Sequence, residues 1–515
     1  MDPGRPVANK FYLTTAIDYS NGDPHLGHAL EKIGADCIAR YRRLRGDQVH
    51  YLMGMDEHSQ SVMQAAAKAG VSPAQWVERM ANTFADYWRR LECSNDDWIR
   101  TTEPRHIRGV TALLERIRQR RPDDLFVSEY EGLYCTGCEE FKQEAQIVDG
   151  HCVEHPTLDL VPTKERNHFF RLSAWRDEVL KRIRDGSFGV EPAIRRNEVV
   201  RFLQDGLQDI SISRVQLPWG IPFPGDPDQT VYVWFDALIN YLSATGFPDD
   251  GYTRLWPADL HIIGKGISRF HCIIWPAMLL AAGVELPRAV WAHGYVQWEG
   301  AKMSKTAGAT VTVDTAINRH GPDALRYFLL REIGFENDGN FSWERFDIRY
   351  TNELADGYGN LASRIIAMIG RYLEGKTPET RADTPLDQEA RTRIAAYRAA
   401  MDKHLIHEGA QETWGLISRA NQYVEETAPW NLAKAGDQAT LQNVLGALAR
   451  ALAQITLLIQ PYIPGKTVLV WQALGLAGSP ADSRWPSLES PETGGKSVTK
   501  LTPLFPKPLA AHLTD

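Results

Sequence analysis

The sequence predicts an α/β protein with a doubly wound parallel sheet, followed by an all-α bundle. A β-branched and aromatic run, FYLTTAI (11–17), precedes apolar residues that recur every three or four positions from Leu26 to Leu44. A second apolar run, VHYLMGMDEH (49–58), precedes another helical pattern. Strands that alternate with helices favour parallel pairing through right-handed crossovers. After about residue 350 the periodicity is helical almost throughout.

Composition is that of an ordinary soluble protein. The 515 residues are 43% hydrophobic and 24% charged, and this length corresponds to roughly three or four domains. We expect no secretory signal and no membrane span, because the N-terminus lacks an apolar segment and no uncharged apolar run reaches ~18 residues. Six cysteines are too few for a disulfide scaffold, which predicts a cytoplasmic location. The net charge of −8 argues against indiscriminate nucleic-acid coating but allows a local basic patch.

A Cys/His cluster and a turn-rich stretch interrupt the strand–helix rhythm and predict an insertion. The rhythm resumes at TVYVWFDALINYL (230–242) and LHIIGKG (260–266). The predicted domains are the first half of the α/β domain at 8–127, the insertion at 128–225, the second half at 226–298, a connecting region at 299–355 and the helical bundle at 356–515.

The stretch PHLGHALE (24–31) lies where the first strand gives way to a helix. Asp23 can cap that helix, and Pro24 suits its first turn. A helix start offers unpaired N–H groups to phosphate, glycine allows close approach, and His25 and His28 can both donate hydrogen bonds. The stretch therefore predicts a polyphosphate site. For this motif alone, a pair of capping or core histidines is the simpler interpretation.

A second motif, AKMSKTAG (301–308), places Lys302 and Lys305 on either side of Met-Ser in a loop bounded by glycine. Lysine is a compact cation that can follow a migrating phosphate. Taken alone, such a pair usually marks a solvated face.

Cysteine and histidine spacing predicts a metal site. The pattern is C-x2-C, thirteen residues, then C-x2-H, and four protein ligands without an open position indicate structural zinc. The alternative is four unrelated residues. The predicted ligands are Cys135, Cys138, Cys152 and His155. The other cysteines, Cys37, Cys93 and Cys272, are expected to pack as small apolar residues.

Together, HLGH and KMSKT resemble the two signatures of class I aminoacyl-tRNA synthetases, with Thr306 in place of the usual serine. The resemblance narrows to the methionyl-tRNA synthetase family and covers nearly the whole chain. The motifs that carry it are TTAIDYSNGDPHLGH, GMDEH, DDWIRTTEPRH, GLYCTGCEEF, NHFFRLS, DISISR, YVWFDALINY, GKGISRFHCIIWPAML and HGYVQWEGAKMSK, with fainter matches at GNLASR and YVEETAPWNLAK.

The resemblance implies a Rossmann-type catalytic domain, a zinc-bearing insertion and an anticodon-binding bundle. It implies ligation of L-methionine to tRNA(Met) through methionyl-adenylate, with Mg²⁺ accompanying ATP. We expect a monomer, since no further tRNA-binding domain follows the bundle.

The resemblance also implies site residues. Aromatic and aliphatic side chains suit a thioether, and Asp56 suits the substrate ammonium, although without the family these aromatics would be assigned to the core. The expected methionine-binding residues are Ile17, Tyr19, Asp56, Trp234, Ala237, Tyr241, Ile267 and His271. The expected ATP-binding residues are His25, Gly27, His28, Gly264, His293, Val296, Lys302 and Lys305, of which the two histidines and two lysines are expected to be catalytic. Asn360, Arg364 and Trp430 are expected to read the anticodon.

Four residues depart from the family pattern: Asp18, Met55, Ser59 and Gly266. Gly266 stands where an aspartate is expected near the ribose. Two alternatives follow. One is a paralogue that activates another amino acid or serves a non-tRNA acceptor. The other is a catalytically silent RNA-binding homologue, against which the intact HLGH and KMSK motifs argue.

Overall fold

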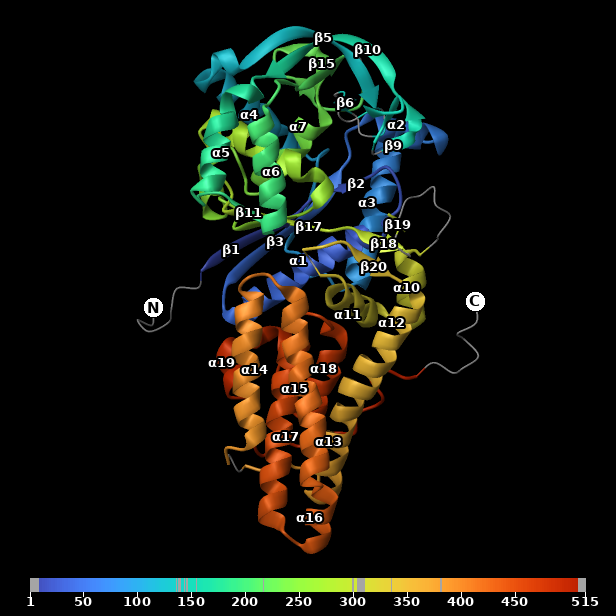
Figure 1. The fold of residues 1–515 in the computed structure, drawn as a ribbon, viewed down its shortest axis with the longest axis vertical. Coiled ribbons are helices and arrows are strands. Elements are labelled where there is room, and N and C mark those ends of the chain that lie inside the picture. The colour runs from blue at the N-terminus through green and yellow to red at the C-terminus, as the bar shows by residue number, and fades with distance from the viewer. Residues whose placement is uncertain are drawn as a thin grey trace.

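The computed structural model describes residues 9–507, except 136, 138–139, 143, 145–146, 154, 216, 299–300, 303–310, 335 and 380–381. The side chains of residues 130, 140, 141, 155, 301 and 302 also lie outside this description. Figure 1 shows an elongated molecule with a sheet-containing half at one end and a helical bundle at the other.

Within the described chain, seven strands form a parallel sheet in the order β11-β17-β16-β1-β3-β2, with β4 paired to β3. The strands are β1 Lys10–Thr15, β2 Asp18–Tyr19, β3 Gln48–Asp56, β4 Asp97–Arg100, β11 Gly189–Glu191, β16 Leu260–Gly264 and β17 Ala289–His293. The chain builds outward from β1 in both directions, so the strand order reverses between β1 and β16. Ligands bind at such switch points, beyond the carboxyl ends of the strands.

Helices cover both faces of this sheet, which confirms the predicted doubly wound fold. Phe11 and Leu13 join one buried cluster with α1, whereas Tyr12 faces the other side and joins a cluster with α4 and α9. The helical segments are α1 Leu26–Arg45, α2 Gln60–Lys68, α3 Pro73–Arg90, α4 Pro104–Arg120, α7 Val233–Leu238, α8 Asn240–Ser243, the π-helical η6 Phe270–Ile274 and α9 Trp275–Ala282.

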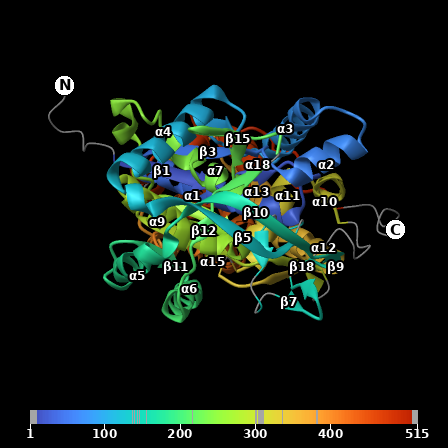
Figure 2. The same ribbon diagram turned by 90° about the horizontal axis from the view of Figure 1, so that it is seen from above.

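Antiparallel strands form a cap over one end of the sheet half, where Figures 1 and 2 show β5 and β10 crossing the top of the molecule. The strands of this part are β5 Leu125–Cys135, β6 Glu140–Lys142, β7 Ile147–Val148, β8 His151–Cys152, β9 His155–Asp159, β10 Val161–Phe170, β12 Ile210–Ser211, β13 Ser213–Val215, β14 Pro222–Phe223 and β15 Asp226–Val231. The range predicted as one insertion, 128–225, also contains α5 Arg176–Arg184, β11 and α6 Ala193–Asp205. Because β11 pairs with β17, part of this range belongs to the parallel sheet and not to the antiparallel cap. A three-residue strand carries too little pattern to be recognised from sequence.

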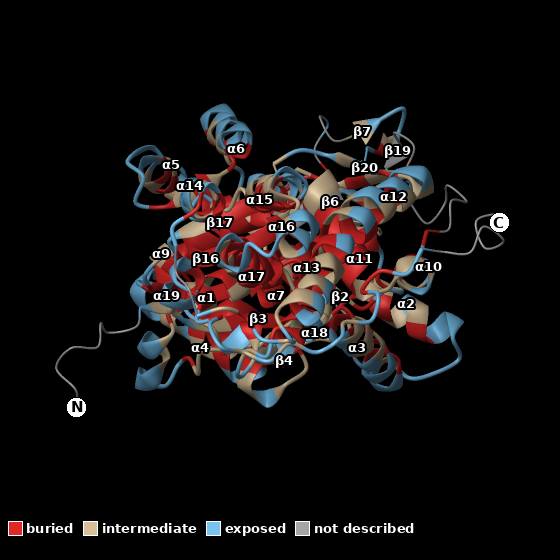
Figure 3. Cartoon of the chain, turned by 90° about the horizontal axis from the view of Figure 1, so that it is seen from below, coloured by how far each residue is buried: buried red, intermediate tan, exposed pale blue. Residues whose placement is uncertain are grey.

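A small sheet and two helices connect the halves: β18 Val296–Trp298, β19 Ala301–Lys302, β20 Gly339–Phe341, α10 Val313–His320 and α11 Pro322–Glu332. The bundle then comprises α12 Trp343–Arg349, the π-helical η7 Tyr350–Gly359, α13 Asn360–Tyr372, α14 Pro385–Met401, α15 Ile406–Thr427, α16 Pro429–Ala435, α17 Gln438–Ile459, α18 Pro464–Ala473 and α19 Trp485–Glu489. In the described chain, α17 is long and apolar enough to cross a membrane, but 83% of its apolar window is buried inside the protein. It is the core helix of the bundle (Figure 3).

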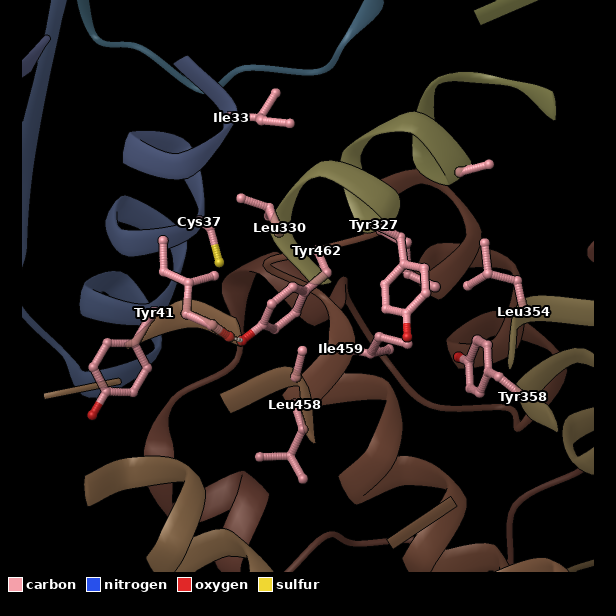
Figure 4. Packing of buried hydrophobic residues seen from close by; sticks show 14 of the residues in the cluster. Ile33, Cys37, Tyr41, Tyr327, Leu330, Leu354, Tyr358, Leu458, Ile459 and Tyr462 are labelled. Carbon is pink, nitrogen blue, oxygen red and sulfur yellow. Dashed lines mark hydrogen bonds between the residues drawn. The ribbon is translucent and has the colours of Figure 1, made fainter. Parts of the chain in front are cut away.

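The two halves share one core. Ile33 and Cys37 of α1 meet Leu330 of α11 and Tyr462, which follows α17, in a single buried cluster (Figure 4). Arg326 crosses this joint. Its guanidinium pairs with Asp36 at 2.6 Å and donates to the carbonyl oxygens of Leu91, Pro461 and Tyr462 at 2.9, 2.8 and 3.2 Å. The contacts to Asp36 and Leu91 reach the sheet half, and those to Pro461 and Tyr462 reach the end of the bundle, so Arg326 of α11 joins the two.

Candidate active site

A cavity of about 290 Å³ opens at the carboxyl ends of β1, β16 and β17, beside the switch point. It brings together residues far apart in the sequence. The expected methionine-binding residues all line it: Ile17, Tyr19, Asp56, Trp234, Ala237, Tyr241, Ile267 and His271. The expected nucleotide-binding residues His25, Gly27, His28, Gly264 and His293 line it too. Val296 is buried in β18 and is not among the lining residues.

The two histidines of HLGH cap α1, which begins at Leu26 rather than near Pro24. The Nδ1 atom of His25 accepts hydrogen bonds from the backbone N–H groups of Gly27 and His28, at 3.1 and 3.4 Å. The Nδ1 atom of His28 accepts from the backbone N–H of His25 at 3.3 Å. The two rings stack with centroids 3.8 Å apart. The prediction that Asp23 caps this helix is wrong, because a reciprocal histidine box takes that role.

This cap also fixes the chemistry of the rings. When Nδ1 accepts a hydrogen bond, the proton of a neutral imidazole must lie on Nε2. His25 and His28 can therefore cap the helix and still donate from Nε2 to a ligand. A Cβ built on Gly27 would lie 2.9 Å from Cε1 of His25, so glycine leaves room for the capping ring.

One wall of the cavity is aromatic and uncharged. The Nδ1 atom of His271 lies 3.1 Å from the carbonyl oxygen of Ile267, so it carries the proton, and Nε2 accepts from the Tyr241 hydroxyl at 2.7 Å. Burial lowers the pKa of His271 to about 4, which keeps it neutral at pH 7. Trp234 stacks on Phe270 with centroids 4.0 Å apart. Such a wall suits an apolar, polarizable side chain.

Buried carboxylates lie beside this wall. Asp56 is 5% exposed at the end of β3. Lys32, buried in α1, donates to Glu31 at 2.8 Å and to the Ala16 carbonyl oxygen at 2.6 Å, and it pairs with Asp18 at 2.9 Å. Burial raises the pKa of Asp18 to about 6 against the opposing effect of the Lys32 ammonium. The cavity therefore carries negative charge where a substrate ammonium could bind.

The second signature begins in a strand that pairs with the segment leading away from the cavity. His293 ends β17 and lines the cavity, and the chain continues directly into β18. Lys302 lies in β19, whose backbone pairs with β18 so that Lys302 is opposite Gln297. The Lys302 side chain and the whole of Lys305 lie outside the described residues.

The four departures from the family pattern have local structural partners. Asp18 pairs with Lys32, as above. Met55 is fully buried in β3, and the hydroxyl of Ser59 caps α2 by accepting from the Val62 N–H at 3.0 Å. Gly266 lies against Tyr295, another lining residue.

The predicted zinc ligands are only partly described. Cys135 ends β5, Cys152 ends β8, and both thiols are buried. The backbone register places Cys152 opposite His155 of β9. Cys138 and the His155 side chain lie outside the described residues, and no group of three metal-binding side chains is found among the residues that are described. Among the other cysteines, Cys37 and Cys272 are fully buried and Cys93 partly so, as expected of small apolar residues.

The expected anticodon readers lie in the bundle. Asn360 begins α13 and is exposed. Arg364 pairs with Glu425 at 2.6 Å, near the end of α15, and Trp430 on the following short helix α16 is 38% exposed. Figure 1 places α16 at the tip of the bundle, at the far end from the sheet half.

Sequence reasoning missed several lining residues, including Ala16, Glu31, Leu238, Gly294 and Tyr295. Glu31 could have been found, because it lies one turn after His28 on the same helix face. Tyr295 follows His293 by two residues, but no spacing rule indicates that its side chain points into the cavity.

Comparison with known families agrees with this geometry. The family model described as "tRNA synthetases class I (M)" matches residues 11–159 and 157–366. The model described as "Anticodon binding domain of methionyl tRNA ligase" matches residues 374–500. The α/β half with its cavity, followed by the helical bundle, defines a class I aminoacyl-tRNA synthetase.

Individual relatives narrow the class. The methionine–tRNA ligase of Thermotoga maritima is 39% identical over 97% of this chain and 80% of its own length. That of Streptomyces coelicolor is 37% identical over 97% of both chains. The solved methionyl-tRNA synthetase of Mycobacterium tuberculosis in complex with methionyl-adenylate is 38% identical, with a TM-score of 0.92 over 97% of this chain and 100% of that one. The chain belongs to the methionyl-tRNA synthetase family, and it catalyses ATP-dependent ligation of L-methionine to tRNA.

Proposed function

We propose that the cavity holds methionine and ATP side by side and forms methionyl-adenylate. The observation that supports this most is the convergence of both expected residue sets on one cavity at the strand ends. The thioether would lie against Trp234, Tyr241 and His271, and the α-ammonium near Asp56. The uncharged wall suits the side chain, and the carboxylate suits the ammonium.

The phosphates of ATP would lie at the start of α1. The Nε2 groups of His25 and His28 would donate to phosphate oxygens, and the helix N-terminus adds a favourable potential. The methionine carboxylate then attacks the α-phosphorus in line, a P–O bond to the β-phosphate breaks, and pyrophosphate leaves. Little proton transfer is needed, so positioning and charge stabilisation supply most of the catalysis. Mg²⁺ accompanies ATP, and Lys302 and Lys305 would neutralise the leaving pyrophosphate.

The tRNA would complete the reaction. Its terminal ribose hydroxyl attacks the carbonyl carbon of the adenylate, and AMP leaves. We assign anticodon recognition to Asn360, Arg364 and Trp430 at the bundle. Exposed aromatic and guanidinium groups suit unstacked RNA bases. The exposed Trp430 and the position of α16 at the tip support this assignment.

The lysine assignment is tested with Lys305→Ala. Pyrophosphate exchange should slow by about 100-fold or more, while the methionine Kd changes by less than about threefold, because the lysine acts on the leaving group. Lys434→Ala, in the bundle, is the matched control. Exchange measured across all twenty amino acids tests the substrate assignment, and a preference for an amino acid other than methionine would overturn it.

We also propose that Cys135, Cys138, Cys152 and His155 hold one structural zinc ion. Paired cysteines and a histidine at this spacing suit tetrahedral zinc, and the register of Cys152 with His155 supports the second knuckle. Metal analysis should give about one zinc per chain, and Cys152→Ser should lose it. A purified protein that is free of zinc yet fully active and equally stable would exclude the site.

We assign the protein to the cytoplasm and to a monomeric state. The burial of α17 within the bundle argues against a membrane-spanning role for that helix. Sedimentation equilibrium tests the monomeric state.

A further inference from the structure

We propose that Tyr295 is a positioning residue for the nucleotide and that its hydroxyl contacts a ribose hydroxyl of ATP. This inference rests on the proposed function of the cavity. It assigns a role to a residue that neither signature motif contains.

The first observation is the match between Tyr295 and Gly266. Both residues line the cavity. A Cβ built on Gly266 would overlap the Tyr295 hydroxyl oxygen, whereas the ring carbon that carries this hydroxyl would lie 3.4 Å away. The φ of Gly266 is not in the left-handed region, so its backbone would accept alanine. Space for the hydroxyl, rather than backbone conformation, is what requires glycine at this position.

The second observation is that neighbours hold Tyr295 from several sides. Its backbone N–H donates to Asp338 at 2.8 Å, and its carbonyl oxygen accepts from the Gly339 N–H at 3.0 Å. The Lys265 ammonium lies 4.6 Å from the ring centroid and pairs with Asp338 at 2.7 Å. The hydrogen bonds fix the backbone from which the ring extends, and the Lys265 ammonium lies against the ring, so ordering the hydroxyl for a hydrogen bond costs little entropy.

The third observation is the division of the cavity lining. The histidines at the start of α1 suit phosphates, and the wall of Trp234 and Tyr241 suits the amino acid side chain. The remaining side is formed by Gly264, where a built Cβ would lie 3.8 Å from the His293 ring, together with Gly266 and Tyr295. Since the phosphates and the amino acid side chain are assigned to the other two sides, the nucleoside of ATP is the part of the substrates that remains for this one. A phenol both donates and accepts without charge, which matches a sugar hydroxyl.

The test is a double-mutant cycle on the full-length protein, measured by pyrophosphate exchange. Tyr295→Phe should raise the KM for ATP by about 3- to 10-fold, the worth of one hydrogen bond. The kcat and the KM for methionine should change by less than about twofold. Tyr358→Phe, which removes a buried hydroxyl in the bundle, should leave all three unchanged.

Gly266→Ala is the second single variant of the double-mutant cycle. In the parent protein it should displace the hydroxyl and raise the KM for ATP about as much as Tyr295→Phe does. In the Tyr295→Phe background it should cost less than about twofold, because the hydroxyl it would strike is absent. Equal penalties in both backgrounds would overturn the proposal.

Deoxynucleotides identify the contact. With one of the two analogues, 2′-deoxy-ATP or 3′-deoxy-ATP, the nucleotide lacks the contacted hydroxyl. With that analogue, the difference in nucleotide KM between parent and Tyr295→Phe should fall below about twofold. A difference that persists with both analogues would overturn the ribose assignment. If the parent protein itself fails to exchange pyrophosphate with methionine, the proposed function fails. If the parent is active and Tyr295→Phe matches it, only the present inference fails.

Discussion

In the proposed function, the cavity and the tip of the bundle recognise their substrates in opposite ways. Around the cavity, polar groups are buried and bound to one another, as in the Tyr241–His271 pair and the cluster of Lys32 with Asp18 and Glu31. At the tip, Trp430 is 38% exposed and the Arg364 pair lies at the surface. A small molecule that must react needs groups fixed before it arrives, because reorganisation would add to the barrier. An RNA loop supplies much of its own contact area, so exposed side chains suffice.

The largest expected effect is at the joint between the two regions. Arg326→Met should lower the free energy of unfolding by about 3–5 kcal/mol, because it leaves the buried Asp36 carboxylate without its partner. Chemical denaturation measures this loss. Arg391→Met breaks an exposed pair with Asp383 and should leave the free energy of unfolding almost unchanged, because solvent screens the pair. Similar losses in the two variants would show that the joint is not a special point of the fold.

Next comes the cavity. His25→Ala should slow pyrophosphate exchange about 100- to 1,000-fold, since it removes a phosphate donor and loosens the helix start. It should also cost about 1 kcal/mol of stability through the lost cap. Ser72→Ala removes a comparable cap from α3, and it should lose similar stability while keeping full exchange activity. An inactive Ser72→Ala protein would mean that cap loss alone explains the histidine phenotype.

The tip should give a smaller and more selective effect. Trp430→Ala should reduce tRNA charging about 5- to 150-fold, the worth of one stacked base, and leave adenylate formation unchanged. Aminoacylation and pyrophosphate exchange, measured side by side, separate the two steps. Leu469→Ala, at 40% exposure on α18, serves as the exposed-residue control. Unchanged charging kinetics in Trp430→Ala would remove this residue from the anticodon site.

The smallest effect concerns pH. Burial acts to raise the pKa of Asp36, but the guanidinium groups of Arg40 and Arg326 overcome it and lower the pKa to about 2. Because the folded pKa lies below the unfolded one, the unfolded chain binds more protons in acid. The pair therefore adds ~2 kcal/mol of stability above about pH 4, and this is lost as pH falls towards 2. Denaturation curves at pH 7, 4 and 3 measure it, and Asp36→Asn should flatten this dependence.

Features that depend on neighbouring residues in the chain could be predicted from the sequence. Strand–helix alternation predicted the parallel sheet, and HLGH predicted the face of α1 that lines the cavity. The exact start of α1 was mispredicted because Asp23 and Pro24 are ordinary start signals, whereas a histidine box is an unusual one. The pairs Asp18–Lys32 and Gly266–Tyr295 depend on how distant segments approach. Periodicity carries no information on such approaches, so these contacts appear only in the folded chain.

Helix α1 has a further consequence. It begins at the reaction cavity with His25, and near its other end the Tyr41 hydroxyl donates to Asp402 of the bundle at 2.5 Å. Twenty residues of helix span about 30 Å and resist bending. Helix α1 therefore links the reaction cavity to the near end of the bundle as one rigid element, so neither part can shift along the helix axis without moving the other.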